Sequence, residues 1–446
     1  MNYNKFKNYF FKKYLYYLAG GAVSGLGAYM LYKIINTKKV AAKSKDIKLF
    51  TLTQDEAELR SSIVSEIKYN LFLQLNPLLA NKGAFEGAIS IEFKLSSSDS
   101  NIFIDYAGKV KSISINGEDV GIAYEGERLY LKRKYLFIGH NKVNVKFESN
   151  YGNYNKGLVF YQDQDDNRSY VYTDCEPCYT HLIFPCFNQP SLKSNIKLTV
   201  SSFEDWTVLS SGCNNSSKFV NLDAQINSKV SVQKNNKIIS KKNDIDLFLK
   251  DLGSKLNLPK INKDFVLHSF EEVENISVGA FSIIAGHYTL AEISDNISIY
   301  LRNSILDKQV NYKFICQTTN KIFNWLNTNL KTNIVNSNFN IVFVPYLKSE
   351  SSAFLNSVVL NEDLLGADKK LITSTFCTNN KYDKMNLFAH LACTTALRWF
   401  NIETTPQWWD DIWFSKGFSI FFAFHILKQL SDMVIKYIII LSIYLF

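Results

Sequence analysis

Hydrophobic and polar residues alternate with a period of two through much of the first half of the chain. Turns rich in Asn, Gly and Asp separate these segments, which is the pattern of half-buried strands joined by short connections. The alternating segments are Phe85–Leu95, Asn101–Ala107, Val110–Gly117, Arg128–Arg133 and Lys142–Ser149. We therefore expect an antiparallel sheet region to about residue 210, preceded by a short helix over Thr53–Val64.

The pattern changes in the second half. Asn311–Leu330 has the spacing of an amphipathic helix, and Phe339–Leu347 is an apolar strand among helical segments. Residues 214–262 are polar and rich in Lys and Asn, which indicates an insertion with one short helix over Asp244–Leu256. The pattern predicts an α+β fold, in which an antiparallel β domain is followed by an α/β domain.

A stretch near the N-terminus has the properties of a membrane helix. Tyr14–Tyr32 contains no charged residue in nineteen positions, and a helix of that length just spans a hydrocarbon core. It predicts a single-pass anchor, and Lys residues on both sides leave its orientation open. A cleaved secretory signal is the alternative. The identity of the membrane is also undecided, because the sequence fits an extracellular or lumenal protein as well as a protein of the mitochondrial inner membrane.

Composition and charge exclude several classes of function. The chain has 446 residues, with 46% hydrophobic and 20% charged, which are globular values with room for two or three domains. A net charge of +9 without an Arg-rich cluster or a binding motif argues against nucleic acid as a partner. Seven cysteines do not make a disulfide framework. Cys175 and Cys178 form a CxxC, but Pro177 and the strand context argue against a redox or metal site.

Three stretches together resemble the aminopeptidase N family of zinc metallopeptidases. They are "CEPCYTHLIFPCFNQPSLK" at Cys175–Lys193, "VPYLKSESSAFLNSVVLNEDLL" at Val344–Leu365 and "WFNIETTPQWWDDIWFSKGF" at Trp399–Phe418. The resemblance implies a saddle-like β domain over 46–285, carrying the insertion 214–262, and an incomplete thermolysin-like domain over 286–446. Residues 1–45 would be a basic segment with the membrane helix 14–32. The apolar tail 433–446 could be a buried helix or a second membrane contact, and we favour the interpretation that it is the product of a truncated or misread gene end.

The resemblance also implies a zinc site, and this sequence departs from it. The family uses an HExxH helix, with a Glu further along as the third ligand. With the register set by Trp399, the ligand positions fall on Cys393, Leu397 and Lys416. Leu has no lone pair to donate to a metal, and the Lys ammonium would bring a positive charge to the place of the zinc ion. The general-base position falls on Thr394, which has no carboxylate. We therefore predict no zinc, no other cofactor and no peptidase activity.

The substrate side of the site differs as well. The family's exopeptidase loop aligns with Glu350–Phe354, where Ala353 takes the position of the Glu that holds the substrate amine. The family's catalytic Tyr would lie beyond Phe446. Glu176 matches a Glu that helps to bind a free amine in some members, and Asp174 lies two positions before it. These two carboxylates either attract an N-terminal ammonium or are ordinary solvated loop acids.

The sequence therefore predicts a membrane-anchored, aminopeptidase N-like pseudopeptidase with a binding or scaffolding role. Its partner would be a peptide or another protein, besides the membrane at residues 14–32. One alternative is an active zinc-dependent aminopeptidase that removes N-terminal residues, with the site damaged by a gene-model error. A second alternative is a non-functional fragment.

Overall fold

The computed structural model describes residues 52–75, 83–97, 102–152, 156–219, 265–294, 296–306, 310–334, 338–365 and 381–430. The chain divides into two units, Met1–Thr53 and Gln54–Phe446, and the fold below is that of the second. Three predicted segments lie outside the described residues: the membrane helix 14–32, the helix 244–256 and the tail 433–446. Among the helices that are described, none is both long enough and apolar enough to cross a membrane.

The predicted β region forms a large mixed sheet. Its path runs β13-β14-β11-β1-β2-β8-β4-β5, and β15 also pairs with β11. The strands are β1 (Val64–Gln74), β2 (Ala84–Leu95), β4 (Lys109–Ile115), β5 (Glu118–Asp119), β8 (Gly139–Asn150), β11 (Ser194–Phe203), β13 (Asn214–Phe219), β14 (Phe265–Phe270) and β15 (Val273–Ile276). The short helix α3 (Gln54–Ile63) precedes β1, as the sequence predicts.

Two details of the prediction were wrong. The sheet is not wholly antiparallel, because β1 and β11 run parallel to each other. Ile67 pairs with Ser194 at one end of this pairing, and Gln74 pairs with Ser201 at the other. Parallel neighbours need a long connection, and more than a hundred residues separate these two strands. The predicted insertion also begins too early, because Asn214–Phe219 is strand β13, paired with β14.

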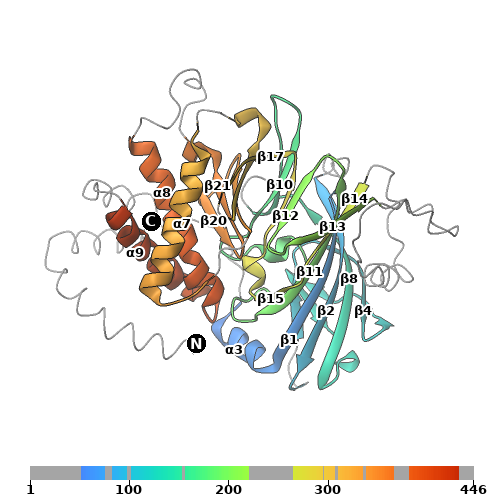
Figure 1. Cartoon of the computed structure of the whole chain (residues 1–446). Helices are drawn as coiled ribbons and strands as arrows, with labels where there is room; N and C mark the ends of the chain where they lie inside the picture. Colours follow the sequence, from blue (N-terminus) through green and yellow to red (C-terminus); the bar gives the residue numbers. More distant parts are fainter. Residues whose placement is uncertain are drawn as a thin grey trace, which may run out of the picture. The chain divides into compact units, whose positions relative to one another are not determined.

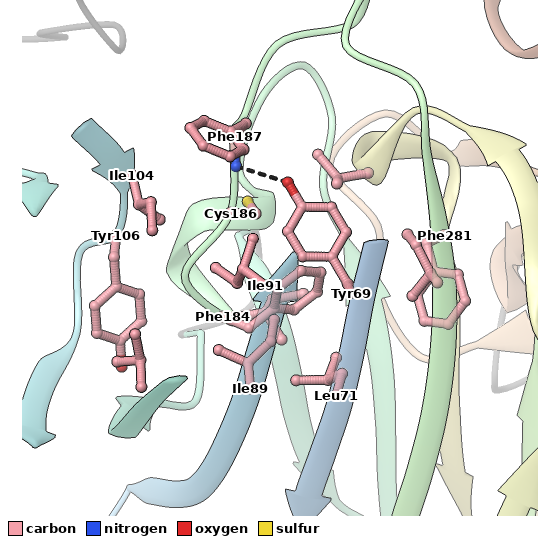
Figure 2. Close-up of a cluster of buried hydrophobic side chains, with 14 of the residues drawn as sticks. Tyr69, Leu71, Ile89, Ile91, Ile104, Tyr106, Phe184, Cys186, Phe187 and Phe281 are labelled. Carbon is pink, nitrogen blue, oxygen red and sulfur yellow. Dashed lines mark hydrogen bonds between the residues drawn. The ribbon is translucent and has the colours of Figure 1, made fainter. Parts of the chain in front are cut away.

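Smaller sheets complete the β part. One has the order β12-β16-β10-β9 and the other β3-β7-β6. Their strands are β3 (Ile102–Asp105), β6 (Tyr124–Glu125), β7 (Arg128–Leu131), β9 (Gly157–Gln162), β10 (Ser169–Asp174), β12 (Thr207–Ser210) and β16 (Ile283–Gly286). Between the sheets lies a core of aromatic and aliphatic side chains (Figure 2). Within it, the Phe187 backbone N–H donates to the Tyr69 hydroxyl at 2.9 Å.

The remaining strands form a separate mixed sheet with the order β17-β18-β19-β21-β20. They are β17 (Tyr288–Ser294), β18 (Ile297–Arg302), β19 (Phe339–Val344), β20 (Ser351–Phe354) and β21 (Ser357–Asn361). The predicted helix is α7 (Tyr312–Leu330), which connects the parallel strands β18 and β19. Helices α8 (Lys381–Leu397) and α9 (Ile412–Leu430) pack against each other, and α8 also contacts α7, β20 and β21 (Figure 1).

The chain between α8 and α9 is tied to the β part. A π-helical turn, η6 (Arg398–Glu403), continues α8, and a short 3-10 turn, η7 (Trp409–Asp411), leads into α9. The indole Nε1 of Trp409 donates to the Asn188 carbonyl at 2.9 Å, and the ammonium of Lys193 donates to the Glu403 carbonyl at 2.8 Å. These bonds hold the helices against the loop that follows β10, which places Glu176 beside α9.

Candidate functional site

Helix α8 carries the positions at which a zinc peptidase would hold its metal. Residues four apart on a helix share a face, so Cys393 and Leu397 are neighbours. Both side chains are buried, at 7% and 1% exposure. The hydroxyl of Thr394 donates to the His390 carbonyl at 2.6 Å, one turn back along the same helix. The general-base position therefore holds a hydroxyl that is already committed to the helix backbone.

Lys416 on α9, which the alignment places at the third ligand position, makes an ion pair with Glu176. Its ammonium contacts the carboxylate of Glu176, which also accepts a hydrogen bond from the Ser352 hydroxyl at 3.3 Å. Burial raises the pKa of the Cys393 thiol to about 11, and the Lys416 charge opposes that rise. Lys416 is therefore within electrostatic reach of Cys393 on α8.

Asp174 ends β10 beside this ion pair. Its side chain is 2% exposed, and its Oδ2 has no hydrogen-bond partner among the described residues. Burial and, to a smaller extent, the negative charge of Glu176 raise the pKa of Asp174 to about 7. The charges of Lys348 and Lys416 act in the opposite direction. Asp174 is thus a buried acid that changes charge near neutral pH, and it is not the solvated loop acid that the sequence left open.

The donor set does not fit zinc. Zinc sites use thiolate, imidazole and carboxylate ligands, usually four of them around the metal. Here one side chain is aliphatic, one is a cation already paired with Glu176, and the remaining thiol is held protonated by burial. Throughout the described residues, no group of three or more His, Cys, Asp or Glu side chains is placed to hold a metal ion.

Strand β20 lines the same region. It is the edge strand of its sheet, and it holds the residues aligned with the exopeptidase loop. Ala353 is buried at 6% exposure and offers no group to an amine, and Phe354 is buried in the core beside it. Just before the strand, Glu350 contacts Nε2 of His390 at 3.0 Å, and the Ser351 hydroxyl contacts Nδ1 of the same ring at 3.0 Å.

The CxxC lies in the loop after β10 and is not at a helix N-terminus. Both thiols are buried and unbridged, and burial raises the pKa of Cys175 and of Cys178 to about 12. A thiol needs its thiolate form to bind metal or exchange disulfides. Neither cysteine has that form at neutral pH.

Comparison with known proteins finds similarity to aminopeptidases. Residues 65–233 match the Peptidase M1 N-terminal domain. The chain is 22% identical over 380 residues to aminopeptidase N of Streptomyces lividans, covering 83% of this chain and 38% of that protein. It is 22% identical over 375 residues to probable aminopeptidase 1 of Sulfurisphaera tokodaii, and 22% identical over 275 residues to aminopeptidase Q of Mus musculus. Residues 65–233 thus carry the M1 peptidase N-terminal domain, and the similarity to aminopeptidases N and Q supports a distant relationship of the chain to the aminopeptidase N family.

The family assignment confirms the resemblance predicted from the sequence. The match to the S. tokodaii protein covers 82% of this chain and 39% of that protein. The match to mouse aminopeptidase Q covers 59% of this chain and 40% of that protein. The chain thus spans about two fifths of the length of the curated relatives that it matches. The thermolysin-like character of the second part and the predicted domain boundaries stay predictions.

Sequence reasoning missed several residues of the site. It placed Lys416 at the third ligand position and Glu176 among the amine-binding candidates, but it did not pair them. It gave His390 no role in the site. Ser351 and Glu350 lie 39 and 40 positions away from His390 in sequence, so no local spacing connects them.

Proposed function

We propose that this chain is a peptide-binding, aminopeptidase N-like protein that has lost zinc-dependent hydrolysis. The observation that carries the proposal is the ion pair between Lys416 and Glu176. A cation on α9 takes the position of a metal ligand, and it is neutralised by an acid that the family uses toward the substrate amine. The site is thereby electrically balanced without a metal ion.

The surrounding residues support the loss of hydrolysis. Water attack on a peptide needs a base within hydrogen-bond reach and a group that polarises the carbonyl. Thr394 has neither a carboxylate nor a free hydroxyl proton, since it donates to the His390 carbonyl. Cys393 is protonated at neutral pH because burial raises its pKa to about 11.

A binding role is supported by the edge strand. The edge of a sheet can add an extended peptide through main-chain hydrogen bonds, without any catalytic group. Strand β20 is such an edge and lies against α8. The amine subsite differs from that of an exopeptidase, because the Glu176 carboxylate is already paired with Lys416. We therefore propose that the ligand is held along its main chain and that its N-terminal ammonium contributes little.

The first experiment measures metal and hydrolysis on the purified full chain. Elemental analysis should find no stoichiometric zinc, and aminoacyl-p-nitroanilides should not be cleaved with zinc added. One tightly held zinc ion per chain would overturn the loss of the metal site and favour the active-enzyme alternative.

The second experiment measures peptide binding by fluorescence polarisation. Each labelled peptide is prepared with a free and with an acetylated N-terminus. Acetylation should change affinity by less than about twofold for the natural chain, and Lys416→Met should create a preference of about fivefold or more for the free amine. Lys428→Met removes an exposed Lys from the same helix and is the matched control. Absence of binding to any peptide of a broad library would refute the binding role.

We also propose that residues 14–32 anchor the chain in a membrane through one helix. The support is the uncharged stretch of nineteen residues in the sequence. Alkaline carbonate should leave the full-length protein in the membrane pellet. Its release would refute the anchor, and a mature N-terminus after about residue 35 would favour the cleaved signal.

A further inference from the structure

Three side chains near the edge strand form a chain of hydrogen bonds that zinc chemistry does not use. The Ser351 hydroxyl lies 3.0 Å from Nδ1 of His390, and Nε2 of the same ring lies 3.0 Å from Oε2 of Glu350. Ser351 begins β20, Glu350 immediately precedes it and His390 comes from α8. A hydroxyl, an imidazole and a carboxylate in series are the parts of an activated serine nucleophile.

The carboxylate determines which ring nitrogen of His390 carries the proton. An ionised carboxylate only accepts hydrogen bonds, so the neutral ring must place its hydrogen on Nε2, facing Glu350. The bond from His390 lowers the pKa of Glu350, which keeps that carboxyl ionised at neutral pH. Nδ1 is then left with a lone pair directed at the Ser351 hydroxyl. The ring can take the hydroxyl proton while its other nitrogen stays bound to the acid.

The backbone supports this arrangement at a cost. Glu350 has φ +59°, in the left-handed region that favours glycine. Adjacent residues of an extended strand point to opposite faces, so this turn lets Glu350 and Ser351 reach one ring. A strained conformation held by a charged side chain is a pointer to function.

We propose that Ser351 is a nucleophile that His390 activates and Glu350 positions, and that it is acylated by carboxylic esters. The Ser351 oxygen would bond to the acyl carbon while its proton passes to Nδ1 of His390. The ester's alcohol then leaves with that proton. Water, losing a proton to the same nitrogen, releases the acid and restores the hydroxyl. No metal ion and no oxidant are required, and the proposal does not rest on the peptide-binding role.

The three side chains differ in solvent exposure, and this difference determines which labelling reagent can reach Ser351. Ser351 is 7% exposed and His390 4%, whereas 42% of the Glu350 side chain is exposed. A small reagent is therefore needed to reach the hydroxyl. Diisopropyl fluorophosphate is suitable, because the serine oxygen bonds to phosphorus, fluoride leaves and the proton passes to the histidine. It measures the acylation-like step that this relay governs, without requiring turnover.

The experiment treats the full chain with diisopropyl fluorophosphate and locates the adduct by peptide mass mapping. One adduct on Ser351 is expected. Ser351→Ala should abolish it, and His390→Gln should slow labelling by about a hundredfold. The matched control is His425→Gln, which changes an exposed histidine on α9 and should leave the rate unchanged. Thermal melting of each variant shows that it is folded.

Two further variants separate nucleophile activation from a purely structural contact. Ser351→Cys should regain reactivity toward iodoacetamide that again depends on His390. Glu350→Gln should slow labelling about tenfold, and Glu350→Asp should restore part of the rate. A folded natural chain with no adduct at Ser351, under conditions that label a standard serine hydrolase, would overturn the proposal. Equal labelling rates with and without His390 would also overturn it.

Discussion

The ammonium of Lys416 on α9 is paired with the carboxylate of Glu176, which lies in the loop after β10. These two positions are 240 residues apart in sequence. In the family, by the alignment, one would hold the metal and the other the substrate amine. In this chain the two charged side chains pair with each other instead. The pair keeps a positive charge near α8.

The first prediction concerns the stability that this pair provides. Lys416→Met should lower the free energy of unfolding by about 1–2 kcal/mol, between the small values of exposed pairs and the larger losses of broken buried ones. The intermediate value follows because Lys416 is 33% and Glu176 19% exposed. Urea denaturation of Lys416→Met and of the control Lys428→Met measures it.

A double-mutant cycle tests whether the loss belongs to the pair. Adding Glu176→Gln to Lys416→Met should cost little more, because the uncompensated carboxylate is then gone. Strictly additive losses for the two substitutions would mean that the residues do not interact in solution.

The second prediction concerns pH. Burial raises the pKa of Asp174 from 3.8 to about 7, so the folded chain binds this proton more tightly than the unfolded chain. The contribution of Asp174 to stability therefore falls as pH rises from about 4 to about 7, and the full penalty remains above pH 7. Asp174→Asn removes the charge, so it should stabilise the chain by about 2–4 kcal/mol at pH 8 and by almost nothing at pH 4.

Urea denaturation at both pH values checks this prediction. Asp119→Asn is the control, because Asp119 is exposed on β5. If Asp174→Asn gave the same change in stability at pH 4 and pH 8, Asp174 would not titrate in a buried environment.

The third prediction concerns the core of the β part. Tyr69→Phe removes the hydroxyl that accepts the Phe187 backbone N–H (Figure 2). A buried donor left without a partner costs about 1–3 kcal/mol, so the free energy of unfolding should fall by that amount. A loss below about 0.3 kcal/mol in urea denaturation would mean that water or another acceptor replaces the hydroxyl.

Much of the fold could be predicted because single segments carry the signal. The period-two pattern of Phe85–Leu95 matches β2, and the helical pattern of Asn311–Leu330 matches α7. The pairing of β1 with β11 could not be found that way. Strand direction depends on how distant segments meet, and nothing in Ile67–Gln74 distinguishes a parallel neighbour from an antiparallel one.

In the candidate site, too, some features could be predicted from one segment of the sequence and others depend on how distant segments pack together. Motif spacing alone placed Lys416 at a ligand position, because Trp399 and the following residues set the register. It could not show that Glu176 would take up the Lys416 charge, or that burial would move the pKa of Asp174 to about 7. Both effects arise between the β part and the helices, where tertiary packing determines distances and exposure.

The fourth prediction restores the metal site and tests the central claim. Cys393→His and Leu397→His place two imidazoles on one face of α8, and Thr394→Glu supplies the carboxylate at the general-base position. With Lys416→Glu added, the chain should bind zinc. Without it, the ammonium opposes the ion, since like charges a few Å apart repel strongly where water is partly excluded.

The most direct measurement is a zinc titration that compares three folded variants. One carries the three α8 changes alone, one adds Lys416→Glu, and one adds Lys428→Glu, which makes the same change in net charge at an exposed position of α9. The variant with Lys416→Glu should bind zinc at least about a hundredfold more tightly than the other two. Equal affinities in all three would contradict the account, because Lys416 would then not lie at the ligand position.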